Sequence, residues 1–221
     1  MTARAGSGRG RTCAVVPVKS LDAPKSRLRP HLGEQGAREL TLAMLADVLE
    51  ALLAVPELSR VAVTTPDARV AEAAREAGAE ALLRDDPGLN AAIDAACGVL
   101  APGHQDAALT VLGDVAGARA DDISQLLAAA PARGGALAPS RDGGTAALLR
   151  RPADVFPAGF GAGSAKRHRE LAEAVGTALV ELPLASLALD LDEPEDLAAF
   201  LAAPGGGSRT RRLLRYLEAK G

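Results

Sequence analysis

Short apolar runs alternate with helix-patterned segments along almost the whole chain. Residues 13–18 and 60–64 have strand length, while residues 35–54 and 89–100 carry apolar positions at helical spacing. The connections between these segments are short. The alternation predicts a three-layer α/β fold with a mostly parallel sheet. Within it, we expect residues 134–150 to form a hairpin inserted beside the cleft.

We expect one domain over residues 13–203, because 221 residues are enough for a single sizeable core. Residues 1–12 are basic, contain Gly and Ser and lack an apolar stretch, which predicts a disordered leader rather than a signal peptide. A Gly-rich linker at 204–208 precedes a basic helix at 209–220. This helix is expected to pack on the domain or on a second copy, so a homodimer is an open alternative.

Composition excludes several classes of protein. The net charge of −3 argues against a nucleic-acid or membrane surface, and no apolar run approaches the length of a membrane-spanning helix. With three Phe, one Tyr and no Trp, the chain is poorly suited to stack a purine between aromatic rings. Cys13 and Cys97 match no metal or redox spacing and are expected to be buried, which fits a cytoplasmic protein.

Three carboxylates follow predicted strands. Asp114 closes the apolar run 107–113, and Asp190 and Asp192 lie two residues apart in a run that we expect to be a strand, so both would point to one face. Clefts in α/β sheets open at the carboxyl ends of the strands. Mg²⁺ prefers carboxylate oxygens, with substrate phosphates completing its shell. The pattern therefore predicts a magnesium site for a phosphorylated substrate.

Helix capping is the competing interpretation for one of these acids. Asp192 precedes Glu193, Pro194 and Glu195, a pattern typical of a helix start with Asp192 as the N-cap. Asp190 has no such explanation. An unpaired carboxylate at the end of an apolar strand is costly to bury, which favours a metal or a cationic partner.

Two further segments are candidate phosphate or ligand sites. Lys19, Lys25 and Arg27 follow the first predicted strand, where they would contact a polyphosphate or simply face solvent. No P-loop motif is present. Asn90 precedes a helix, where it would contact a base or ribose or serve as a cap.

The segment from Phe160 to His168 reads Phe-Gly-Ala-Gly-Ser-Ala-Lys-Arg-His. Ser164 is expected to cap a helix whose free N–H groups form an anion site. The cations of the following turn are unfavourable at a helix start, which points to a bound anion. An ordinary capped helix with a solvated basic turn remains the alternative.

Several motifs together resemble one enzyme family. They are Val16-Pro-Val-Lys19, Lys25-Ser-Arg-Leu28, Gly88-Leu-Asn90, Gly113-Asp114, Phe160-Gly-x-Gly-Ser164-x-x-x-His168, Leu189-Asp-x-Asp192-x-Pro-x-Asp-Leu197 and a late Gly-x-x-Arg-Thr at 206–210. Their order and spacing are similar to those of the 2-phospholactate/phosphoenolpyruvate guanylyltransferases, which act in biosynthesis of the deazaflavin coenzyme F-420. The resemblance covers about residues 13–214.

The resemblance implies a Rossmann-like nucleotidyltransferase fold of the glycosyltransferase-A-like kind. It also implies that GMP passes from GTP to phosphoenolpyruvate or 2-phospholactate, with release of pyrophosphate. The implied roles are Mg²⁺ binding by Asp114, Asp190 and Asp192, phosphate binding by Lys19, Lys25 and Arg27 with the last two catalytic, and acceptor binding by Thr145, Gly161 and Ser164.

The chain departs from the family pattern at two places. Val115-Ala116 replaces the usual Leu-Pro after the Gly-Asp pair, and Ala146 stands where a hydroxyl or amide side chain is usual. These changes keep three other functions open: another magnesium-dependent nucleotidyltransferase, a nucleotide-sugar glycosyltransferase using Asp190 and Asp192, and a non-catalytic domain that binds a phosphorylated ligand.

Overall fold

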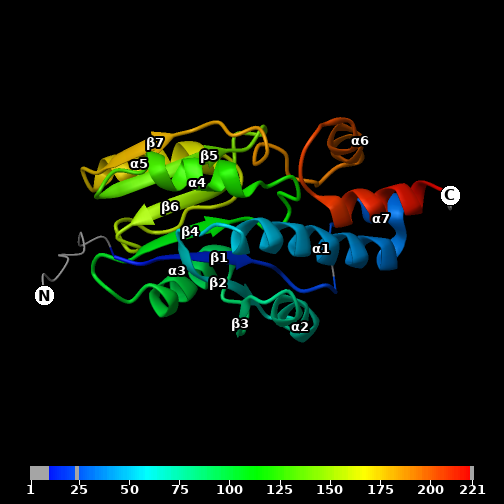
Figure 1. The fold of residues 1–221 in the computed structure, drawn as a ribbon, viewed down its shortest axis with the longest axis horizontal. Coiled ribbons are helices and arrows are strands. Elements are labelled where there is room, and N and C mark those ends of the chain that lie inside the picture. Colours follow the sequence, from blue (N-terminus) through cyan, green and yellow to red (C-terminus); the bar gives the residue numbers. More distant parts are fainter. Residues whose placement is uncertain (1–9, 23–24, 220–221) are drawn as a thin grey trace, which may run out of the picture.

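Seven strands form one mixed sheet in the order β3-β2-β1-β4-β6-β5-β7 (Figure 1). The computed structural model describes residues 10–22 and 25–219. The strands are β1 (Thr12–Pro17), β2 (Leu58–Thr65), β3 (Glu80–Leu83), β4 (Ala107–Val111), β5 (Gly134–Pro139), β6 (Thr145–Arg151) and β7 (Ala178–Glu181). The helices are α1 (Arg29–Leu53), α2 (Ala68–Glu76), α3 (Leu89–Leu100), α4 (Ala120–Ala129), α5 (Ser164–Ala174), α6 (Pro194–Ala202) and α7 (Ser208–Glu218).

Strand β6 is the exception in an otherwise parallel sheet. It runs antiparallel to β4 and β5, whereas β1 is parallel to β2 and β4, β2 to β3, and β5 to β7. The predicted three-layer, mostly parallel α/β fold is confirmed. The expected hairpin also forms and its turn borders the cleft, but it is not an insertion. It lies inside the sheet, because β6 pairs directly with β4.

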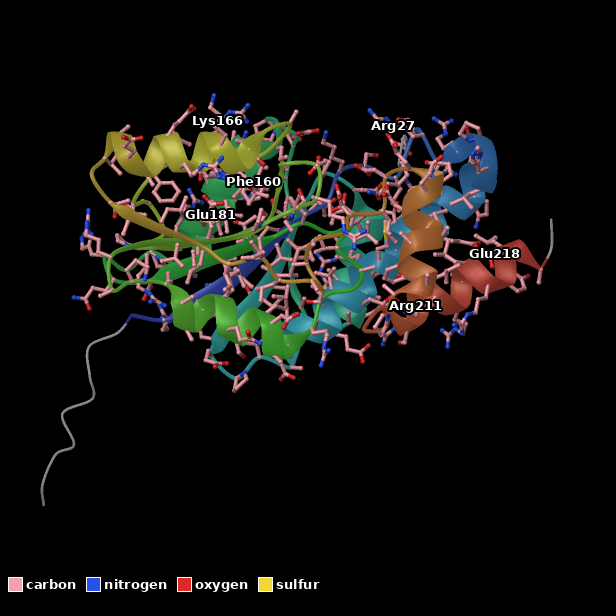
Figure 2. All side chains as sticks on the ribbon, turned by 90° about the horizontal axis from the view of Figure 1, so that it is seen from above. Arg27, Phe160, Lys166, Glu181, Arg211 and Glu218 are labelled. Atoms are coloured by element: carbon pink, nitrogen blue, oxygen red, sulfur yellow. The ribbon has the colours of Figure 1, made fainter. Side chains whose placement is uncertain are left out.

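Side chains of β1 alternate between two apolar cores, as the pleat of a strand requires. Ala14 and Val16 pack in the cluster that includes buried residues of α1, α2 and α4. Cys13 and Val15 pack in the cluster that includes residues of α3 and α5. Figure 2 shows α5, which carries Lys166, on the side of the sheet opposite to the green helix α4. The sheet is therefore the middle of three layers.

A third cluster joins the two ends of the chain. It combines Leu28, just before α1, and Met44 in α1 with Leu191, Phe200 of α6 and Leu214 of α7. Helix α7 accordingly packs along α1, and α6 lies against α7 (Figure 1). The predicted basic helix packs on its own chain in this way. The homodimer stays a prediction.

The strand expected at residues 187–192 does not form. This segment is held by single backbone bonds, from Leu191 N–H to the Asp114 carbonyl at 3.3 Å and from Arg141 N–H to the Ala188 carbonyl at 2.9 Å. The seventh strand is instead β7, which was not predicted. It has four residues, all exposed except the half-buried Leu179, so it lacks a readable apolar pattern.

The predicted leader 1–12 is wrong for its last two residues. The Arg11 N–H donates to Asp106 at 2.8 Å and Thr12 opens β1, so both belong to the folded part. Residues 1–9 lie outside the described residues.

None of the described helices is long and apolar enough to cross a membrane.

Candidate active site

A cavity of about 620 Å³ opens where β1 and β4 end and β6 begins. Nine of the ten predicted site residues line it; only Asn90 does not. The nine are Lys19, Lys25, Arg27, Asp114, Thr145, Gly161, Ser164, Asp190 and Asp192. They come from five separate stretches of chain, so the fold gathers side chains that the sequence places far apart.

Lys25 joins the two acidic segments of the cavity. Its Nζ lies 2.8 Å from Asp114 Oδ2 and 2.6 Å from Asp192 Oδ1. Burial of the Lys25 ammonium opposes its charge, but the two carboxylates outweigh this and raise its pKa. Lys25 therefore stays protonated, and it adopts a left-handed backbone conformation (φ 43°) that non-glycine residues rarely take.

Two carboxylate groups in the cavity are incompletely compensated by the described residues, although Lys25 pairs with one oxygen of Asp114. Asp114 Oδ1 is buried and has no hydrogen-bond partner among the described residues. Burial, together with the nearby charges of Asp114, Asp142 and Asp192, raises the pKa of Asp190 to about 6. Such groups would be stabilised by a divalent cation, so the donor set here fits Mg²⁺.

The three predicted metal ligands differ in their partners, because Asp114 and Asp192 both pair with Lys25. Asp192 is turned toward Lys25, and the described residues include no group of three His, Cys, Asp or Glu side chains able to hold a metal ion. Mg²⁺ is usually held by one or two carboxylates and by substrate phosphates. The metal roles of Asp114, Asp190 and Asp192 stay predictions.

Arg27 lies at the outer edge of the cavity. Its guanidinium pairs with Glu193, and both side chains are largely exposed. Figure 2 shows Arg27 next to α1 and α6, across the molecule from Lys166 on α5. Glu193, and not Asp192, caps α6, in a capping box with Asp196. The capping interpretation of Asp192 is therefore wrong by one residue.

Residues 156–163, here called the glycine loop, form the opposite wall of the cavity. Gly161 and Gly163 have positive φ values of 119° and 65°, which explains the spacing of glycines in this motif. Asn90 holds the loop through two bonds to Phe160, accepting from its N–H at 2.7 Å and donating to its carbonyl at 3.1 Å. The amide of Asn90 is thus occupied by the backbone, outside the cavity lining, and its predicted contact with a base finds no support here.

The basic first turn of α5 does not indicate an anion. Lys166 is exposed and pairs with Glu170, while Arg167 donates to the Gly159 carbonyl at 2.8 Å. Burial, with Arg150 and Arg167 nearby, lowers the pKa of His168 to about 4, so this side chain is neutral at pH 7. The inference that these cations point to a bound anion was wrong. The expected capping of α5 by Ser164 was also wrong, because Gly163 occupies the N-cap position.

Ser164 and Thr145 nevertheless face the cavity together. Ser164 Oγ donates to Thr145 Oγ1 at 3.0 Å, and both residues line the cavity, although each is almost fully buried. Gly161 lies beside them. The cavity thus has a cationic and acidic wall on one side and a wall of hydroxyl groups and glycine backbone on the other. Such a site suits a substrate with several phosphate or carboxylate oxygens.

Residues 12–220 match the protein family described as "Guanylyl transferase CofC like". The chain belongs to this family. It is 42% identical to a phosphoenolpyruvate guanylyltransferase of Sphaerobacter thermophilus, covering 89% of this chain and 96% of that protein. It is 36% identical to a 3-phospho-D-glycerate guanylyltransferase of Phenylobacterium zucineum, covering 94% and 97%.

The fold also matches a solved structure from Desulfovibrio desulfuricans G20 that is assigned as a nucleotide-diphospho-sugar transferase. The TM-score is 0.77 at 20% sequence identity, covering 95% of this chain and 96% of that one. This likeness shows the Rossmann-like nucleotidyltransferase fold that the sequence resemblance implies.

The departures from the pattern of the CofC-like guanylyl transferases lie in the apolar core. Val115 and Ala146 are buried in the main cluster, and Ala116 is buried in the cluster under α6 and α7. None of the three lines the cavity. Val115, Ala116 and Ala146 therefore contribute packing behind the site.

The sequence interpretation missed Asp67, which anchors the loop after β1. Its carboxylate accepts the Leu21 N–H at 2.8 Å and lies 2.8 Å from the Arg69 guanidinium. The Arg69 side chain, helped by backbone N–H donors, lowers the pKa of Asp67 and keeps it ionised. The available signal was the Pro-Asp pair before α2, which is typical of an N-cap.

The ion pair between the buried Arg150 and the partly exposed Asp94 was also missed. Arg150, 1% exposed, donates to Asp94 at 2.7 Å and to the Phe156 carbonyl at 2.8 Å, and Asp94 accepts the Ala158 N–H at 3.1 Å. The pair ties the glycine loop to α3 and β6. A single carboxylate inside the apolar segment 89–100 was the signal that could have indicated it.

The low pKa of His168 predicts a specific loss of stability in acid. Unfolded histidine has a pKa of about 6.5, so the unfolded chain binds a proton below that pH while the folded chain does not until about pH 4. The contribution of His168 to the free energy of unfolding is therefore fully present above pH 6.5. It decreases by about 2–3 kcal/mol as the pH drops toward 4. Urea unfolding at pH 7 and 4.5 should show this loss in the wild type and a smaller one in His168→Asn. Parallel losses would contradict it.

Proposed function

We propose that this protein transfers GMP from GTP to a phosphorylated three-carbon acid, phosphoenolpyruvate or 2-phospholactate, and releases pyrophosphate. Membership of the CofC-like family and the guanylyltransferase names of its relatives support this reaction. The observation that carries it is the cavity that has Lys19, Lys25 and Arg27 on one wall and Thr145 and Ser164 on the other. We place the reaction in the biosynthesis of the deazaflavin coenzyme F-420.

The reaction joins two anions. A phosphate oxygen of the acceptor attacks the α-phosphorus of GTP, and the bond from that phosphorus to the oxygen bridging to the β-phosphorus breaks. A phosphate oxygen is already ionised near neutral pH, so no general base is needed. Lys25 and Arg27 hold the GTP phosphates, lower the repulsion between the two substrates and stabilise the charge that develops on pyrophosphate.

Mg²⁺ is part of this proposal. Asp114 and Asp190 would hold it, with the charge of Asp192 close by, because a buried oxygen of Asp114 lacks a partner and Asp190 has too little positive charge near it. The bound ion supplies neutralisation of the phosphate charge. In the structure Lys25 already neutralises part of the same acidic wall.

The acceptor is proposed to bind through Thr145, Gly161 and Ser164. Phosphoenolpyruvate, 2-phospholactate and 3-phosphoglycerate each carry a carboxylate and a phosphate, and both groups accept hydrogen bonds from hydroxyl and backbone donors. These acids differ by few atoms, and two of them appear in the names of the relatives. We favour phosphoenolpyruvate because the more similar of these two relatives is named for it.

The deciding experiment measures pyrophosphate release from GTP and Mg²⁺ with each of the three acids, and identifies the nucleotide product by mass. Release with one acid establishes the reaction and its acceptor. A nucleotide-sugar glycosyltransferase would instead release a nucleoside diphosphate from a sugar donor. A non-catalytic binding domain would be stabilised by ligand against heat without forming product.

Thr145→Val is expected to raise the KM for the acceptor about tenfold or more and to leave the KM for GTP within about twofold. Valine keeps the shape but removes the hydroxyl, and losing one hydrogen bond to a charged ligand costs about 1.5–3 kcal/mol. Steady-state kinetics with each substrate varied would measure both constants.

The matched control is Thr110→Val on β4, a buried threonine that does not line the cavity. It should leave both KM values unchanged. Equal effects of Thr145→Val on both substrates would remove Thr145 from the acceptor site.

We further propose that the enzyme works in the cytoplasm. Cys13 and Cys97 are free and buried, which suits a reducing compartment. Sedimentation of the purified protein would test the predicted homodimer.

A further inference from the structure

His168 connects the glycine loop with the hydroxyl pair of the cavity. Its Nε2 lies 3.0 Å from the Gly159 N–H, and its Nδ1 lies 3.0 Å from Thr145 Oγ1. The imidazole is fully buried and meets the ring of Phe160 edge-on, with centroids 5.0 Å apart. Both ring nitrogens therefore have one defined partner.

These two contacts determine which nitrogen carries the proton. The backbone N–H of Gly159 can only donate, so Nε2 must accept and must be unprotonated. In a neutral imidazole the other nitrogen then carries the hydrogen, so Nδ1–H donates to Thr145 Oγ1. Burial, together with the neighbouring charges of Arg150 and Arg167, favours this neutral form.

The contacts within the pair do not use all the hydroxyl hydrogens of Thr145 and Ser164. Thr145 and Ser164 have one hydroxyl hydrogen each, and their contact at 3.0 Å uses one of them, donated by Ser164. Thr145 cannot donate to His168, because Nδ1 is itself a donor. One hydroxyl hydrogen is thus left over, and both residues line the cavity.

We propose that His168 is a positioning residue of the acceptor site: by donating to Thr145, it leaves one hydroxyl hydrogen of the Thr145–Ser164 pair free for an ionised oxygen of the acceptor. This rests on the proposed function. His168 itself touches no substrate. A carboxylate or phosphate oxygen only accepts hydrogen bonds, so a pair with this polarity suits it.

Two substitutions separate the contacts of His168. In His168→Asn the side-chain amide reaches the position of Nδ1 and can donate to Thr145, but it is too short for Gly159. In His168→Gln the amide oxygen reaches the position of Nε2 and can accept from Gly159, but the donor to Thr145 is lost. Each variant loses one hydrogen bond, so we expect similar decreases in Tm.

The kinetic constants should differ between the variants. We expect the KM for phosphoenolpyruvate to rise about tenfold or more in His168→Gln and at most about threefold in His168→Asn, with the KM for GTP within twofold in both. A purely structural role would affect the two variants and the two substrates alike. The proposal is overturned if the two variants share one acceptor KM or if the KM for GTP changes in parallel.

A second measurement does not depend on activity. Nitrogen NMR of the ¹⁵N-histidine-labelled wild type should show one of its three histidines protonated on Nδ1 and not titrating between pH 6 and 8. The His168 signal should vanish in His168→Asn, which distinguishes it from the signals of His31 and His104. Protonation on Nε2 would overturn the proposal. If the wild type transfers GMP to none of the three acids, the proposed function fails, and the assigned tautomer is still tested by the NMR result.

Discussion

Replacing Asp190 by Asn is expected to abolish GMP transfer and to stabilise the metal-free protein at the same time. The loss of activity should be at least about a thousandfold in kcat, because a cation bound by Asp190 would supply several kcal/mol of charge neutralisation. Asparagine has the same shape but removes the negative charge. The change therefore tests the charge and not the packing.

The gain in stability follows from the surroundings of Asp190. Burial and the neighbouring acids raise its pKa to about 6, so the ionised side chain at pH 7 weakens the folded state relative to the unfolded one, where the pKa is about 4. Removing the charge should add about 1–2 kcal/mol to the free energy of unfolding, a value reduced for the partial exposure of this group. The gain should appear as the pH rises from 4 to above 6.

Chemical unfolding at pH 7 in the presence of a chelator, together with the pyrophosphate assay in Mg²⁺, measures both effects. Asp154→Asn is the control, since Asp154 is exposed and outside the cavity. It should change neither quantity. An Asp190→Asn variant with the activity of the wild type would show that Asp190 takes no part in metal binding.

Asp47→Ala should produce the largest loss of stability, about 2–4 kcal/mol. The Asp47 carboxylate is 2% exposed and accepts the N–H groups of Arg209 and Thr210 at 3.1 and 2.8 Å, so it caps α7 from within α1. Without it, two N–H groups at the start of α7 lose their partner. Because Leu214 of α7 packs with Leu28 and Leu191, activity should fall as well.

Glu50→Ala provides a matched control on the same helix. Glu50 also pairs with Arg209, but this ion pair is exposed, so its loss should cost less than about 1 kcal/mol. Limited proteolysis should cleave at α7 in Asp47→Ala and not in Glu50→Ala. Equal stability of the two variants would show that Asp47 does not hold α7 in place.

Much of the site could be predicted because it combines local motifs with the geometry of α/β sheets. Lys25, Asp114 and Asp190 were expected to converge, since they follow strands or precede helices at one edge of the sheet, and all three line the cavity. The ion pairs of Lys25 with Asp114 and Asp192 could not be predicted. They depend on distances between segments that no periodicity encodes.

The failures have physical causes of a similar kind. Residues 187–192 read as a strand from alternation alone, but their backbone bonds to single groups such as the Asp114 carbonyl. Arg167 was interpreted as a sign of a bound anion because it is a cation in the first turn of a helix, whereas the contact of Asn90 with a base stays a prediction. The backbone of the glycine loop uses both of them, and only tertiary structure reveals such partners.

The bond between Thr210 and Asp47 joins positions 163 residues apart. During synthesis on the ribosome, α1 is complete long before α7 exists. Until then, the Asp47 carboxylate and the apolar face formed by residues such as Leu40 and Met44 lack their final cover. Leu28 and Leu191, which adjoin the cavity residues Arg27, Asp190 and Asp192 along the chain, can therefore reach their final packing only late in translation. A nascent chain will hold most of its sheet well before it can bind substrate.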